Sequence, residues 1–394
     1  MHRLAIITSH PIQYNAPLFK ILAQREDLNV KVFYSWKGTE EKVDPEFGEK
    51  ITWDIPLLEG YEYSFVDNKA KDPGTHHFFG LDNPEMVSEI NRWGANSILI
   101  YGWSSKTHLS VMRYFYGRIP IFFRGDSTLL SGGNTFRKIF RKIWLKWVYQ
   151  HIDFAFYPGV RSKEYFLSNS VPSNKLLHVP HSIDNRRFSD DSNHYEQIAQ
   201  QQRHKMKIPD DAIVLLFAGK FVERKQPIML LKAVQEIVNS DSSLNLHLIY
   251  VGTGPLLSEL NEASRKCEYI HILGFKNQTE MPVIYRLGDI YVLPSKIETW
   301  GLGVNEAMAC SRPVIVGNKV GCAPDLVKST ISGEIFDSDN IEDLKNTLHG
   351  FIKEKSRIYG MRESSYKFIK DWSIEKSAEQ TGNYIIERSI GSSL

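Results

Sequence analysis

The sequence predicts an α/β protein with two doubly wound domains in series that face each other across a cleft. Its 394 residues, 42% of them apolar and 24% charged, are enough for two domains with separate hydrophobic cores. Short apolar runs alternate with helical patterns, and strands that are apolar throughout are typical of parallel sheets covered on both faces. A polar stretch over residues 189–211 interrupts this alternation. We therefore expect one domain over residues 1–190 and a second over residues 191–375.

Runs rich in β-branched and aromatic residues predict the strands. In the first domain they cover residues 4–9, 30–36, 97–103, 120–125, 154–159 and 176–180. Residues 38–84 fit the pattern poorly, so we expect an insertion or long loops there, facing the cleft. In the second domain the strands should cover residues 213–220, 246–252, 270–275, 290–294 and 313–318. The loops at the carboxyl ends of the strands should line the cleft.

Composition narrows the class of protein. A net charge of +2 over this length argues against general nucleic-acid binding. The three cysteines have no metal-ligand spacing and suit a reducing cytosol. The N-terminal apolar run stops at His10 and lacks the cleavage site of a signal peptide, and no run approaches the roughly 20 apolar residues of a spanning helix. We expect a cytoplasmic protein, free or attached to the inner face of a membrane.

The most informative stretch is residues 290–321. A short apolar strand ends at Pro294, a polar turn carries Glu298, and Gly301, Leu302 and Gly303 lead into a helix that carries Glu306. The start of a helix is a ready phosphate site, and the glycines let a ligand approach the backbone. Carboxylates would repel a phosphate, so both glutamates suit neutral hydroxyls on either side of it, as in a nucleotide-sugar. The alternative is that Glu306 merely complements a helix start and Glu298 is a solvated turn residue.

The order P-S-x-x-E-x-x-G-L, E-A-M-A and R-P-V-I in this stretch resembles the Glu-x7-Glu signature of the retaining glycosyltransferases of family 4. The resemblance implies the GT-B fold of two Rossmann-like domains, with Glu298 on the donor sugar and Glu306 on the ribose. It also implies that residues 376–394 form a helix that packs back on the first domain. Residues 337–339 read Asp-Ser-Asp, but we interpret them as a turn and predict no metal.

Other predicted donor contacts follow strands of the second domain. Lys220 and Lys225 match the family's basic pair, with lysine in place of the usual arginine at the first position, and would grip the pyrophosphate where other enzymes use a cation. A solvated basic turn is the alternative. The resemblance places Gly252 and Gly254 against the nucleotide and Phe275 near its base. A third glycine is missing from Gly-Thr-Gly-Pro, so a dinucleotide cofactor is weakly supported. We expect no cofactor besides the donor.

The first domain offers a second group of candidates. His10 and Gln13 follow its first strand, where the sequence resembles a family subgroup with His-Pro-Ile-Gln-Tyr. A plain turn before a helix at about Ala16 accounts for only part of this motif. Family members often carry a histidine near the position of Arg124, and this sequence does not. Arg124 or Asp126 takes its place, or the two form a structural ion pair. We predict His10, Arg124 and Glu298 as the catalytic group.

Residues 136–150 predict an amphipathic helix with an aromatic face and a basic side. It is either an ordinary core helix with a solvated side or a surface that docks on anionic lipid.

Together these features predict a retaining, metal-independent glycosyltransferase. It would move a sugar from a UDP-, GDP- or ADP-sugar to a hydroxyl of a glycan or lipid-linked acceptor, in synthesis of cell-surface polysaccharide or lipopolysaccharide. Two alternatives stay open, a nucleotide-sugar epimerase of the same fold and a non-catalytic nucleotide-sugar-binding protein. An epimerase would change the donor without an acceptor, and a binding protein would not turn it over.

Overall fold

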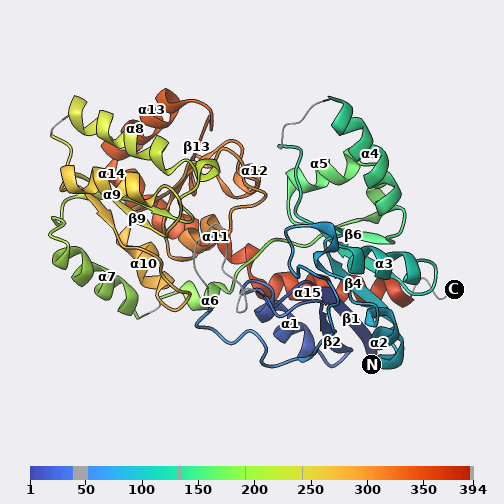
Figure 1. Cartoon of the computed structure of the whole chain (residues 1–394). Coiled ribbons are helices and arrows are strands. Elements are labelled where there is room, and N and C mark those ends of the chain that lie inside the picture. Colours follow the sequence, from blue (N-terminus) through green and yellow to red (C-terminus); the bar gives the residue numbers. More distant parts are fainter. Residues whose placement is uncertain (39–51, 131–134, 191, 242, 391–394) are drawn as a thin grey trace. The chain divides into compact units, whose positions relative to one another are not determined.

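The computed structural model describes residues 1–38, 52–130, 135–190, 192–241 and 243–390, and the side chains of all these except 135–138 and 390 (Figure 1). The chain divides into two compact units. Unit 1 holds the described residues within Met1–Lys42, Pro56–His181 and Ile374–Leu394, and unit 2 holds those within Val43–Ile55 and Ser182–Ser373. Unit 2 therefore starts before the boundary that the sequence predicts at residue 190.

Unit 1 is built on a seven-stranded sheet in the order β3-β2-β1-β4-β5-β6-β7, and its neighbouring strands pair in parallel. The strands are β1 (His2–Thr8), β2 (Leu28–Tyr34), β3 (Glu62–Phe65), β4 (Ser97–Tyr101), β5 (Ile121–Arg124), β6 (Phe154–Tyr157) and β7 (Leu176–His178). Six of them coincide with predicted runs. The seventh, β3, lies where long loops were expected, so that prediction was wrong for residues 62–65.

Helices cover both faces of this sheet, as the apolar strands predict. They are α1 (Ala16–Ala23), α2 (Met86–Trp93), α3 (Lys106–Phe115), α4 (Thr135–Tyr149), α5 (Val160–Ser168) and α15 (Ile374–Ile390), with short 3-10 turns η1 (Phe78–Gly80) and η2 (Ser173–Lys175). One core lies under α2, α3, α4 and α5, and includes Ile98, Val111 and Val148. The other lies under α1 and α15, and includes Ile6 and Phe19. The sheet is therefore doubly wound.

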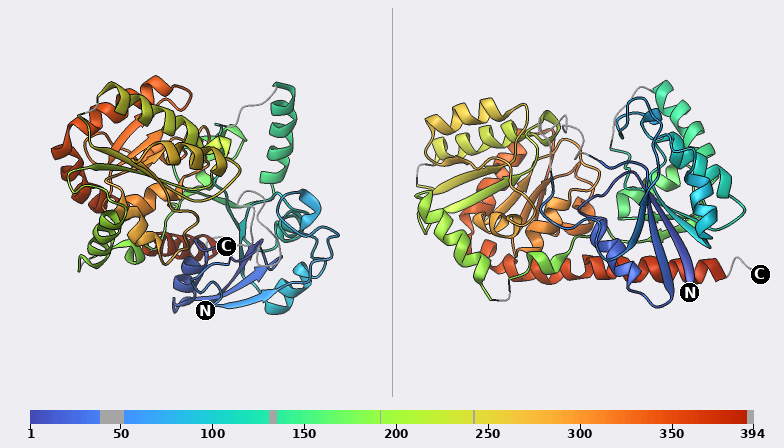
Figure 2. Two further views of the ribbon diagram at one scale, coloured as in Figure 1. Left: turned by 60° about the vertical axis from the view of Figure 1, so that its left-hand side comes forward. Right: turned by 60° about the horizontal axis from the view of Figure 1, so that its bottom comes forward.

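The last helix, α15, belongs to unit 1 although it is far from the rest of that unit in sequence (Figure 2). Ala378 and Ile385 are buried in the core that contains α1. Asn383 Oδ1 accepts a hydrogen bond of 3.0 Å from Arg25 Nη2, and the Tyr384 ring lies 6.2 Å from that of Phe156. These contacts hold α15 against the sheet.

Unit 2 contains a six-stranded sheet in the order β10-β9-β8-β11-β12-β13, again with parallel neighbours. The strands are β8 (Ile213–Ala218), β9 (Leu246–Val251), β10 (Ile270–Ile272), β11 (Ile290–Leu293), β12 (Val314–Gly317) and β13 (Gly333–Phe336). No predicted run covers β13. Like β3, it is an edge strand with a partly exposed face.

The helices of unit 2 surround its sheet. They are α6 (Asn185–Phe188), α7 (His194–Lys205), α8 (Pro227–Ser240), α9 (Leu257–Lys266), α10 (Met281–Leu287), α11 (Leu302–Ala309), α12 (Ala323–Leu326), α13 (Ile341–Lys353) and α14 (Lys355–Ile369), with 3-10 turns η3 (Glu223–Lys225) and η4 (Lys370–Trp372). The polar stretch interpreted as a connection contains α7. This helix packs on α10 and is part of unit 2.

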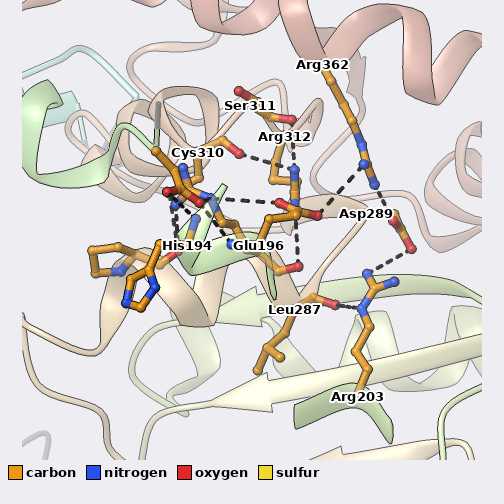
Figure 3. Close-up of polar contacts among 12 residues, drawn as sticks. His194, Glu196, Arg203, Leu287, Asp289, Cys310, Ser311, Arg312 and Arg362 are labelled. Atoms are coloured by element: carbon orange, nitrogen blue, oxygen red, sulfur yellow. Dashed lines mark hydrogen bonds and ion pairs between the residues drawn. The ribbon is translucent and has the colours of Figure 1, made fainter. Parts of the chain in front are cut away.

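Charged side chains fasten α7 to the rest of unit 2 (Figure 3). Glu196 Oε2 lies 2.6 Å from Arg312 Nη2, and Arg312 is almost fully buried. Arg203 Nη2 lies 3.0 Å from Asp289 Oδ2, whose carboxylate is also 2.6 Å from Arg362 Nη2. A stretch that is polar in sequence is therefore held by ion pairs to buried partners. Among the described residues, no helix is both long and apolar enough to cross a membrane.

Candidate functional site

The loop between β11 and α11 is shaped by Gly301, which caps α11 with φ of 99°. A side chain on this residue would be strained in that conformation, and its Cβ would lie 2.9 Å from Val320 Cγ1. At Gly303 a Cβ would lie 2.4 Å from Tyr291 Oη. The Gly-Leu-Gly sequence is therefore required by the backbone and by packing beneath the helix. Leu302, between the two glycines, is the first residue of α11.

Glu298 lies in this loop and forms an ion pair with Lys225, whose Nζ is 2.5 Å from Glu298 Oε2. The Glu298 side chain is 15% exposed and the Lys225 side chain is 16% exposed. Arg224 Nη1 is farther away, at 3.9 Å. The backbone of Glu298 is fixed because its N–H donates to Lys319 and its carbonyl accepts from Gly321. Glu298, predicted to contact the donor sugar, and Lys225, predicted to contact the adjoining pyrophosphate, therefore meet directly.

Glu306 lies on α11 and is only 3% exposed. The hydroxyl of Tyr285, on α10, donates a hydrogen bond of 2.6 Å to Glu306 Oε2. Beneath the same turn lies Tyr291, whose pKa is raised well above its usual value by burial and then by the Glu306 and Glu298 carboxylates. Glu298 and Glu306 are thus both positioned within unit 2, next to the start of α11.

Two further predicted contacts follow β8 and β9. Lys220 is half-buried just after β8, beside Gly219 with its φ of 157°. Gly252 and Gly254 have φ of 138° and 151°, and a Cβ would lie 2.0 Å from Gly219 O at the first and 2.7 Å from Phe221 O at the second. These glycines are therefore required for the two loops to pack together.

Phe275 follows β10 and lies beside Trp53, from a segment far away in the sequence. Its ring centroid is 6.5 Å from that of Trp53. Nearby, Asn277 Nδ2 donates to Thr52 O at 2.8 Å. Residues 52–55 were expected in loops of the first domain, but they belong to unit 2. No local signal in the sequence indicates this contact, because the two segments are more than two hundred residues apart.

In unit 1, His10 follows β1 and is held by its neighbours. Its Nδ1 is 2.9 Å from Ser9 Oγ, and its ring meets that of Trp36 edge-on at 5.6 Å. Burial lowers the pKa of His10 to about 4, so the ring is neutral at pH 7. Gln13 lies between β1 and α1 and is half-buried.

Arg124 lies at the end of β5, and its guanidinium group donates hydrogen bonds to two backbone carbonyls. Nη1 donates to Val179 O at 2.5 Å and Nη2 donates to Pro180 O at 3.3 Å. Burial lowers the pKa of Arg124, although Tyr101 and Asp126 oppose that shift. These contacts join β5 to the chain after β7. His10 and Arg124 lie in unit 1, whereas Glu298 lies in unit 2, so their convergence stays a prediction.

One group of described residues has the composition of a metal site. Asp72, His76 and His77 lie in a loop of unit 1, with their ligand atoms within 4.8 Å of one another. Hydrogen bonds account for this arrangement, since His76 Nε2 is 2.9 Å from Asp72 Oδ2 and His77 Nε2 is 3.0 Å from Asp72 O. At residues 337–339, where we predicted a turn, Asp339 pairs with Lys319.

A comparison with known families covers most of unit 2. The profile described as "Glycosyl transferases group 1" matches residues 199–370, which include Lys225, Tyr285, Glu298 and Glu306. Over this region the chain is similar to the glycosyl transferases group 1 family. The predicted resemblance is confirmed.

Curated relatives match over a similar length. The D-inositol 3-phosphate glycosyltransferase of Thermobifida fusca is 31% identical over 160 residues, which are 38% of this chain and 37% of the relative. That of Rhodococcus opacus is 30% identical over 175 residues, or 42% of this chain and 39% of the relative. The chain thus spans well under half the length of these relatives.

Solved structures match over nearly the whole chain. Sucrose-phosphate synthase from Thermosynechococcus elongatus has a TM-score of 0.74 at 16% identity, with both chains covered completely. Anabaena HepE in complex with UDP-glucose has a TM-score of 0.70 at 15% identity, again with complete coverage. WaaG, a glycosyltransferase involved in lipopolysaccharide biosynthesis, has a TM-score of 0.68 at 15% identity and covers 97% of this chain and 99% of its own. The chain therefore has the GT-B fold, as the sequence predicts.

Proposed function

We propose that the chain is a retaining, metal-independent glycosyltransferase that moves a sugar from a nucleoside diphosphate to a hydroxyl acceptor. One observation carries the proposal. Glu298, Glu306 and Lys225 gather around the start of α11 within a unit similar to the glycosyl transferases group 1 family. This set offers carboxylates for the hydroxyls of a nucleotide-sugar and a cation for its diphosphate.

Each residue then has a role in the transfer. Glu306 accepts hydrogen bonds from the ribose, and Glu298 accepts them from the donor sugar. Lys220 and Lys225 stabilise the negative charge that grows on the diphosphate as the bond from the anomeric carbon to phosphate oxygen breaks. The acceptor oxygen bonds to that carbon on the same face and gives its proton to the departing phosphate. Retention follows from the family resemblance, and Lys225 would exchange its contact with Glu298 for one with phosphate.

His10 and Arg124 act from unit 1 in this proposal. The neutral His10 ring can donate to or accept from a sugar hydroxyl. Arg124 is already engaged with two backbone carbonyls, so it supports the site through the chain after β7. Closure of the two domains would exclude water and limit hydrolysis of the donor.

The donor that we propose first is a UDP-sugar, because HepE of Anabaena, which shares the fold, forms complexes with UDP and UDP-glucose. GDP- and ADP-sugars are the alternatives. The acceptor that we propose is a glycan or lipid-linked sugar in the synthesis of cell-surface polysaccharide or lipopolysaccharide. WaaG, with the same fold, is involved in lipopolysaccharide biosynthesis.

Release of free UDP, GDP or ADP from a panel of nucleotide-sugars tests the proposal. We expect slow release from one donor, and a faster rate when a crude glycolipid extract supplies an acceptor. Lys225→Ala should lower the rate about 100-fold or more, because it removes charge stabilisation at the leaving group. Glu306→Ala should weaken donor binding. Lys266→Ala is the matched control, since Lys266 forms an exposed pair with Glu262.

The outcomes separate the three hypotheses. Donor binding without release, even with extract present, would favour a binding protein. Conversion of one nucleotide-sugar into another without an acceptor would favour an epimerase. Release that Lys225→Ala and Lys266→Ala change equally would contradict the assigned site.

We further propose that α4 docks on an anionic membrane surface, which would suit a lipid-linked acceptor. Ile139, Phe140, Ile143 and Trp144 are between 41% and 72% exposed on this helix. Arg141, Lys142 and Lys146 are exposed beside them, and an open hollow lined by Phe140, Arg141, Ile143, Trp144 and Trp147 lies along the helix. Exposed aromatic and basic side chains together favour the interface of an anionic bilayer.

Flotation with vesicles of neutral or anionic phospholipid tests the docking. We expect binding to anionic vesicles only, and its loss when Arg141, Lys142 and Lys146 are changed to Glu. The control reverses three exposed lysines of unit 2, Lys266, Lys353 and Lys367. Equal binding to both kinds of vesicle, or equal loss in both variants, would contradict docking through α4.

A further inference from the structure

We propose that Tyr285 is a positioning residue that orients the Glu306 carboxylate and so sets the preference of the site for ribose over deoxyribose. The inference rests on the proposed function, because it assumes that Glu306 accepts the ribose hydroxyls of a donor nucleotide. It adds a residue from α10 that the spacing of the glutamates does not reveal. Its basis is the arrangement of side chains beneath the first turn of α11.

The contact between the two residues is short and buried. Tyr285 Oη donates to Glu306 Oε2 at 2.6 Å. Tyr285 is 2% exposed and Glu306 is 3% exposed. A distance of about 2.5–2.7 Å is typical of a hydroxyl that donates to an ionised carboxylate, the stronger class of hydrogen bond. Tyr285 therefore stabilises the charged form of Glu306 and fixes the direction of one of its oxygens.

The phenol of Tyr285 is itself held in place. Its ring lies 5.5 Å from the ring of Tyr291 and 6.1 Å from that of Phe188, both at steep angles. Above it, a Cβ on Gly303 would lie 3.1 Å from Tyr285 Oη. The glycine thus leaves room for the phenol under α11, and the aromatic neighbours prevent the ring from turning away.

A fixed orientation of the Glu306 carboxylate matters for its hydrogen bonds to the ribose hydroxyls. A ribose offers two neighbouring hydroxyls, and an ionised carboxylate can accept about four hydrogen bonds over its two oxygens. The terminal torsion of a glutamate is broad, so an unsupported carboxylate samples many orientations. With one oxygen tied to Tyr285, the carboxylate plane is set before the nucleotide arrives. A ligand that lacks one hydroxyl then loses a preorganised hydrogen bond.

Calorimetric titration with UDP and 2′-deoxy-UDP tests the inference. We expect wild type to bind UDP about tenfold more tightly than the deoxy analogue, as the loss of a hydrogen bond to a charged group implies. In Tyr285→Phe this ratio should fall to about threefold or less, mainly because UDP binds more weakly. GDP or ADP with their 2′-deoxy forms replace UDP if one of them is the nucleotide that binds.

Tyr291→Phe is the matched control. Tyr291 is also buried and packs against the same turn, but its hydroxyl donates to Ala218 O at 3.3 Å instead of to a carboxylate. We expect a similar loss of thermal stability in both variants and an unchanged ribose preference in the control. In a Glu306→Gln background, which removes the buried charge, adding Tyr285→Phe should cause no further loss of preference. That background also serves if Tyr285→Phe alone fails to fold.

The results distinguish this inference from the proposed function. If wild type binds none of the three nucleoside diphosphates, the proposed function is wrong and this inference falls with it. If the nucleotide binds but Tyr285→Phe keeps the full ribose preference, only the inference is overturned. The same holds if Tyr291→Phe reduces the preference as much as Tyr285→Phe does.

Discussion

Replacement of Asp289 by Asn should destabilise unit 2 more than its small chemical change suggests. The carboxylate is 5% exposed, accepts from Val214 N at 2.9 Å, and pairs with Arg203 and Arg362 (Figure 3). Asparagine has nearly the same size and can still accept from Val214. It removes the negative charge, however, and leaves two neighbouring guanidinium groups without that partner.

The structure sets the magnitude. Breaking a buried ion pair by removing one partner costs about 3–5 kcal/mol. Arg203 and Arg362 are 17% and 26% exposed, so water screens part of the loss, and Arg362 also has Glu196 at 4.0 Å. We therefore expect about 2–3 kcal/mol. For a unit of this size, that change lowers the melting temperature by about 5–10 °C.

Differential scanning calorimetry, combined with hydrogen exchange of the β8 and β11 amides, measures this effect. Two units need not unfold together, so exchange assigns the loss to unit 2. Glu363→Gln is the control, because Glu363 and Lys367 form a pair that is 76% and 69% exposed, and water screens such a pair so that it contributes little to stability. If Asp289→Asn and Glu363→Gln shift the transition equally, the reasoning from burial is wrong.

Two further predictions concern backbone strain and pH. Gly301→Ala should destabilise the protein by about 2 kcal/mol and weaken nucleotide binding, because φ is 99° and the new Cβ meets Val320; unchanged thermal unfolding and UDP titration would contradict this. Burial lowers the pKa of His108 to about 4, so its contribution to stability is complete above pH 6.5 and is lost as pH falls from 6.5 to 4. Denaturant unfolding at pH 7 and 5 should therefore show a smaller difference in His108→Gln than in wild type.

The apolar strands could be predicted because burial on both faces leaves a continuous signal. Val30, Ile98 and Ile290 are such residues, and each is buried in the structure. The edge strands β3 and β13 escaped prediction for the opposite reason. Glu62 and Ile335 are exposed, so these strands read as mixed polar and apolar sequence. An edge strand is stabilised by the neighbour with which it pairs, and that neighbour is not local in sequence.

The polar stretch 189–211 is an example in which local composition predicts a connection but the structure contains a packed helix. Its composition is typical of a linker, yet Glu196 bonds to Arg312, 116 residues away. Glu196 is partly exposed, but its partner Arg312 is buried, and no pattern within the stretch itself indicates that arginine. The boundary of unit 2 at Ser182 follows from such distant contacts.

The candidate site divides in the same way. One continuous segment contains the strand, the glycine turn, the helix and both glutamates, Glu298 and Glu306. These features can be predicted from sequence because backbone dihedral preferences and the start of a helix depend on neighbouring residues. The sequence by itself therefore determined the two parallel α/β sheets and the candidate residues next to α11. Only the tertiary structure decided that Tyr285 holds Glu306 and that Lys225 holds Glu298. Those contacts join separate elements, and their distances depend on how the helices and loops pack over the sheet.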